Sequence, residues 1–111
     1  MDMAVEELTD RIRAYFAGRP NVREQRMMGG VAFMLDGNMV VGPMKGGGLL
    51  VRVGKDGYDD ALQRPGAGPM QFTGRTMSGF VEVTGDAVED DEALADWIEV
   101  AIAFVSTLPA K

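Results

Sequence analysis

Three arginines are the residues of this sequence whose type and position best suit a binding site. Arg26, Arg52 and Arg75 each lie within or beside a segment that is predicted to be a strand. A guanidinium group presents its N–H donors in one plane and can hold a carboxylate or a phosphate through two parallel hydrogen bonds. Two interpretations stay open: the three groups converge on such an anion, or each is solvated or ion-paired.

Two residue types that dominate enzyme chemistry are missing from the chain. Its 111 residues include no histidine and no cysteine. This excludes disulfides, thiolate nucleophiles, zinc fingers, iron–sulfur clusters, Ser-His-Asp catalysis and imidazole metal sites. Acid–base catalysis would have to use carboxylates, lysine or tyrosine. We therefore expect no catalytic residue, no bound metal and no cofactor, and the chain is predicted not to be an enzyme.

Acidic and glycine-rich clusters have simpler explanations than ligand binding. The acids of segment 86–92 lack the alternating spacing of a calcium loop, and they precede a predicted helix, where negative charge is favourable. The glycine clusters 46–48 and 66–68 lack the residue order of a phosphate loop and the third glycine of a dinucleotide fingerprint. We interpret the acids as helix capping and the glycines as turns.

The charge of the chain is uneven along its length. Its formal net charge is −6, which disfavours direct binding to nucleic acid. Segment 1–54 holds seven basic and six acidic residues, whereas segment 55–111 holds four and eleven. We expect the basic N-terminal segment to lie near the acidic C-terminal helix, in the same subunit or in a partner. No signal peptide or stretch of ~18 apolar residues is present, so we expect a cytoplasmic protein without membrane contact.

The hydrophobic pattern predicts one domain over residues 1–111, because the length suits a single core. A helix is expected over residues 3–17. Strands are expected at 31–35, 39–41 and 49–53, with a tight hairpin turn at Asp36-Gly37-Asn38. This N-terminal half is thus predicted to fold as a helix followed by a meander of three or four strands.

The C-terminal half is predicted to contain a short helix, two strands and a longer helix. Their expected positions are 55–64, 70–72, 80–83, and from Asp90 to about Leu108. Trp97 on the last helix is interpreted as a core residue, and most of the nine methionines as filler of the core or of an interface. The whole order predicts a two-layer α+β sandwich with a mainly antiparallel sheet and flanking helices.

Four segments resemble, in the same order, the N-terminal domain of the TfoX/Sxy family. The first is residues 26–39, Arg-Met-Met-Gly-Gly-Val-Ala-Phe-Met-Leu-Asp-Gly-Asn-Met, which is similar to the family's Met-Phe-Gly-Gly element, apolar strand and Asp-Gly hairpin. Met28 stands where the family has phenylalanine. The others are the strand 49–53, the Met-Ser-Gly segment 69–80, and the start of the final helix, 91–97.

The resemblance carries expectations about fold and function. Full-length members are regulators of natural competence that act with the cyclic-AMP receptor protein at promoters, and they carry a second, C-terminal helical domain that we do not expect in this chain. The N-terminal domain resembles secretion chaperones, a fold that often dimerises and binds proteins. We accordingly expect a non-enzymatic interaction domain, a homodimer, that modulates a transcription-related protein.

Two other functions remain open, a small-ligand or anion-binding domain that uses the arginines, and a carboxylate-dependent enzyme. The glycines of the first motif are expected to allow a bulge or a close backbone approach. The candidate partner-binding or anion-binding residues are Arg26, Met27, Met28, Gly29, Gly30, Arg52 and Arg75.

Overall fold

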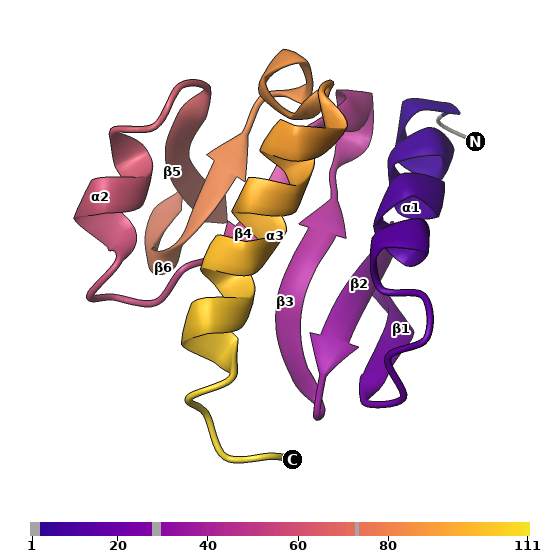
Figure 1. Ribbon diagram of the computed structural model, residues 1–111. Helices are drawn as coiled ribbons and strands as arrows, with labels where there is room; N and C mark the ends of the chain where they lie inside the picture. Colours follow the sequence, from indigo (N-terminus) through magenta and orange to yellow (C-terminus); the bar gives the residue numbers. More distant parts are fainter. Residues whose placement is uncertain (1–2, 28–29, 73) are drawn as a thin grey trace.

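Six antiparallel strands form one sheet in the order β1-β2-β3-β4-β6-β5, and α1 and α3 lie against one of its faces (Figure 1). The computed structural model describes residues 3–27, 30–72 and 74–111. The helices are α1 (Met3–Tyr15), α2 (Tyr58–Leu62) and α3 (Asp91–Val105). The strands are β1 (Val22–Met27), β2 (Gly30–Leu35), β3 (Asn38–Pro43), β4 (Leu49–Arg52), β5 (Ala67–Phe72) and β6 (Arg75–Val83). Two short 3₁₀ turns are η1 (Lys45–Gly47) and η2 (Gly85–Val88).

The predicted α+β class is confirmed, and the predicted order of a helix, three or four strands, a helix, two strands and a helix agrees with the structure, which has four strands in the first group. The β2–β3 hairpin turns at Asp36 and Gly37, whose φ values of 51° and 85° are both positive. This conformation matches the right-handed twist of the flanking strands. The α3 N-terminus is capped as expected, because the Asp90 side chain accepts a 3.1 Å hydrogen bond from the backbone N–H of Glu92.

Several boundaries differ from the predictions. Strand β1 was not expected, because it has no apolar alternation and five of its six residues are exposed. Helix α2 has five residues rather than ten, since turns occupy most of the chain between Gly54 and Gly57. Strands β5 and β6 extend into the expected loops and pair with each other beyond the rest of the sheet. Backbone pairing, rather than side-chain burial, holds all of these added segments.

The core lies between the sheet and the helices α1 and α3. Phe33, Val41, Val51 and Val81 share the inner face of four paired strands and are almost fully buried. Trp97 of α3 is 4% exposed, which confirms that it is a core residue. Of the two roles expected for the methionines, filling the core is not found among the described residues, none of which is a buried methionine, and filling an interface stays a prediction. β-branched side chains occupy the pleated inner face instead.

The basic N-terminal segment lies beside the acidic helix, as its charge predicted. Arg11 of α1 forms a 2.8 Å ion pair with Asp91 and also donates to the backbone carbonyls of Val88 and Glu89. Tyr15 donates a hydrogen bond to Glu99 of α3. Burial, together with this hydrogen bond, raises the pKa of Tyr15 to about 12. These contacts close one side of the interface between α1 and α3.

No helix in the described ranges combines the length and apolar character that crossing a membrane requires.

Candidate functional site

The sheet face opposite α1 and α3 is left uncovered by the helices that the structure describes. Helices α1 and α3 lie on the other side of the sheet (Figure 1). Because side chains alternate along a strand, the register with the buried residues identifies those that point away from the helices. We call this surface the open face, and its residues include Arg23, Gln25, Ala32, Met34, Met39, Gly42, Leu50, Arg52, Phe80 and Glu82.

The residues of the first predicted motif are divided between two sides of the sheet. Arg26 pairs with Val31 and lines a groove beside α1, on the helix-covered side. Met27 ends β1 opposite Gly30, the first residue of β2, and is 41% exposed. Met28 and Gly29 lie outside the described residues. The structure thus brings Met27 and Gly30 together, whereas the Arg26 side chain lies on the opposite, helix-covered side of the sheet.

The three arginines are not brought together either. Strands β2 and β3 lie between β1, which carries Arg26, and β4, which carries Arg52. Arg75 begins β6 and pairs with β5, whereas Arg52 pairs with Phe80, five positions further along β6. Five strand residues span roughly 15 Å. Each arginine must therefore be considered in its own surroundings.

The groove beside Arg26 is electrostatically mixed. It has a volume of about 420 Å³, and Glu6, Asp10 and Arg13 of α1 line it together with Arg26. Arg13 forms ion pairs of 2.8 Å with Asp10 and 2.6 Å with Glu24. The hydrogen bond from Arg13 lowers the pKa of Glu24. Carboxylates thus already surround the cations of this groove, which makes it a poor anion site.

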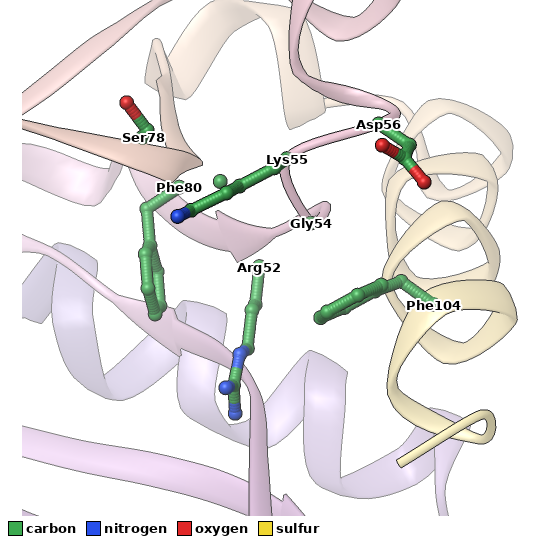
Figure 2. Close-up of a pocket in the computed structure, with 8 residues that line it drawn as sticks. Arg52, Gly54, Lys55, Asp56, Ser78, Phe80 and Phe104 are labelled. Carbon is green, nitrogen blue, oxygen red and sulfur yellow. The ribbon is translucent and has the colours of Figure 1, made fainter.

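A second pocket surrounds Arg52 at the end of β4 (Figure 2). We call it the Arg52 pocket; its volume is about 340 Å³. Its walls are Arg52, Gly54, Lys55, Asp56, Ser78, Gly79, Phe80 and Phe104. The guanidinium carbon of Arg52 lies 5.6 Å from the ring centre of Phe80 and 5.7 Å from that of Phe104. Both distances are within the range of cation–π attraction.

Sequence reasoning found Arg52 but missed the rest of this pocket. Lys55 was expected in a helix, Ser78 was noted only within the Met-Ser-Gly segment 69–80, and Phe104 belongs to the long C-terminal helix. Only the crossing of α3 over the end of β4 brings Phe104 to Arg52. In the described part of the chain, no group of three or more acidic residues is placed to hold a metal ion.

The comparison with known proteins gives one family match. The sequence model of the TfoX N-terminal domain matches residues 14–105, from the end of α1 to the end of α3. No match to a curated protein or to a solved structure was found. The matched range includes the whole sheet, α2 and α3 but only the last two residues of α1, and it covers the four sequence segments that resemble this family. The chain belongs to the TfoX N-terminal domain family.

Proposed function

We propose that this chain is a non-enzymatic regulatory domain that forms a homodimer through the open face and modulates a transcription-related protein. Family membership supports a competence-related regulatory domain. The lack of histidine and cysteine supports a function other than catalysis. The observation that carries the interaction is the uncovered face of the sheet, whose centre is apolar.

The centre of the open face is suited to contact with another protein. Met34, Met39 and Leu50 are only half-buried there, on three adjacent strands. Ala32 and Gly42 lie in one row with Leu50, and their small side chains keep this part of the surface flat. Methionine side chains adapt readily to a facing surface, and exposed apolar patches commonly mark interaction sites. Association would remove these side chains from water without rearranging the sheet.

A second copy of the chain is the partner that fits the charges at the margins of the open face. Arg23 lies on β1 and Glu82 on β6, on opposite sides of the apolar centre. A two-fold axis parallel to the strands can place β1 of one copy over β6 of the other. Gln25 of one copy then lies level with Glu82 of the other, and the long side chain of Arg23, two residues along β1, reaches toward that carboxylate, while Met39 meets Met39. The same surface is thus complementary to itself in both charge and apolar character.

Changing Met34 to lysine is expected to dissociate this dimer. An ammonium group at the centre of the interface would lose its water, so the dimer dissociation constant should rise at least ~10-fold. Sedimentation equilibrium over a range of concentrations measures this constant, and far-ultraviolet circular dichroism checks the fold. Met3→Lys is the matched control, because Met3 is 80% exposed on α1. A wild-type chain that stays monomeric throughout, or equal constants for both variants, would contradict the proposed interface.

The transcription-related role is tested with purified proteins from the same cells. We expect the domain to bind the cyclic-AMP receptor protein or RNA polymerase saturably in biolayer interferometry, and to leave a promoter fragment alone unshifted in a gel. The second result follows from its net charge of −6. If neither protein binds an intact dimer, the transcription role is wrong, and the homodimer is judged separately by sedimentation.

A further inference from the structure

Arg52 is held in place by contacts from two distant parts of the chain. Its guanidinium lies between the rings of Phe80, on β6, and Phe104, on α3, at 5.6 and 5.7 Å (Figure 2). Aromatic rings attract the guanidinium mainly through its flat faces, whereas its N–H donors lie in the plane at its edge. This arrangement fixes the side chain and leaves the donors available for an acceptor.

The residues that the structure describes provide no such acceptor. In the described part of the chain, the ion pairs of arginines involve Arg11, Arg13 and Arg19. Arg52 forms neither an ion pair nor a side-chain hydrogen bond there. Asp56 lines the same pocket, but Figure 2 shows its carboxylate well away from the guanidinium. A half-buried guanidinium without a protein acceptor is a candidate ligand-binding group, because its donors need partners.

The remaining walls of the Arg52 pocket suit an anion. Lys55 adds a second positive charge, whereas Ser78 lies at the far end of the pocket with its hydroxyl directed away from Arg52 (Figure 2). Gly79 stabilises the wall, since its carbonyl accepts hydrogen bonds of 2.8 Å from Val53 N–H and 3.0 Å from Gly54 N–H. The volume of about 340 Å³ lies at the lower end of the range for small-molecule pockets. The pocket therefore combines a net positive charge with a preformed shape.

We propose that the Arg52 pocket binds the oxyanion group of a small molecule, a carboxylate or a phosphate. The in-plane N–H groups of Arg52 donate to two oxygens of the anion, as guanidinium groups do with both classes. Lys55 supplies long-range attraction. Arg52 lies two residues from Leu50 on the open face, so this site adjoins the proposed homodimer contact. Anion binding does not depend on that contact and would stand if it failed.

The experiment is isothermal titration calorimetry of the full chain with inorganic phosphate and, separately, with succinate, in chloride buffer of constant ionic strength. We expect saturable binding of one or both probes. Arg52→Gln should lower that affinity at least ~10-fold, because it removes the charge and the paired donors. Arg64→Gln is the matched control and should leave the affinity unchanged, since Arg64 lies over the Trp97 ring at 5.3 Å but outside the pocket.

The outcomes separate the two sources of anion. Saturation by phosphate alone assigns a phosphorylated ligand, saturation by succinate alone assigns a carboxylate, and loss of both in Arg52→Gln supports the shared chemistry. Saturation by neither probe, or equal affinities in wild type and Arg52→Gln, overturns the proposal. If Arg52→Gln fails to fold, Arg52→Lys is measured instead. It keeps the positive charge but loses the two parallel N–H donors of the guanidinium, so its affinity for the anion should also fall. An unchanged affinity in Arg52→Lys would also overturn it.

Discussion

Replacing Phe33 with alanine is expected to lower the free energy of unfolding by about 3–5 kcal/mol, the range for a large aromatic side chain lost from a core. Phe33 is 1% exposed on β2 and stacks on Phe16 at 5.9 Å between ring centres. This pair connects the sheet to the end of α1. Its loss leaves a cavity that rigid backbone on both sides cannot fill. Urea denaturation followed by circular dichroism measures the change.

Phe80→Ala is the matched control for this prediction. Phe80 lies on β6 but is only half-buried, and its side chain packs on Arg52 rather than on the core. Its removal forfeits less apolar burial and leaves space that water can enter, so the loss should be clearly smaller. Equal losses in the two variants would mean that the stack of Phe33 on Phe16 is not part of the stabilising core.

Gly54→Ala is expected to cost about 2–4 kcal/mol, from backbone strain and overpacking together. Gly54 has a φ of +79°, and a Cβ atom added to it would lie 2.4 Å from Cδ1 of Phe104. The ring of Phe104 would have to move, and with it one of the two contacts of Arg52. Thermal unfolding measures the loss of stability. Calorimetry should also show weaker binding of whichever anion the Arg52 pocket accepts.

Gly18→Ala separates the cost of backbone strain from the cost of steric overlap with Phe104. Gly18 has a similar φ of +86°, yet nothing lies within 4 Å of an added Cβ atom. The expected cost is therefore only the ~1–2 kcal/mol of a left-handed conformation with a Cβ atom. If the two alanine variants lose the same stability, the Phe104 ring is not held against Gly54, and the packing described for the Arg52 pocket is wrong.

The sequence by itself determined the local elements and the family. The stripe of apolar residues predicted α1 and α3, and Asp36-Gly37 predicted the β2–β3 turn, because both signals act between neighbours in the chain. The family match covers all four segments that carry the resemblance. Strand β1 escaped prediction because polar, exposed side chains leave no periodic signal.

Only the tertiary structure decided which of the candidate functional residues lie close together. The sheet order places β4 beside β6 rather than β5, so Arg52 pairs with Phe80, while Arg26 remains three strands away. Phe104 reaches Arg52 because α3 crosses the end of β4. No local pattern encodes these neighbours, since burial of the whole inner face selects the strand order. The open face has the same origin, because both long helices pack on the face with the more apolar residues and leave the other uncovered.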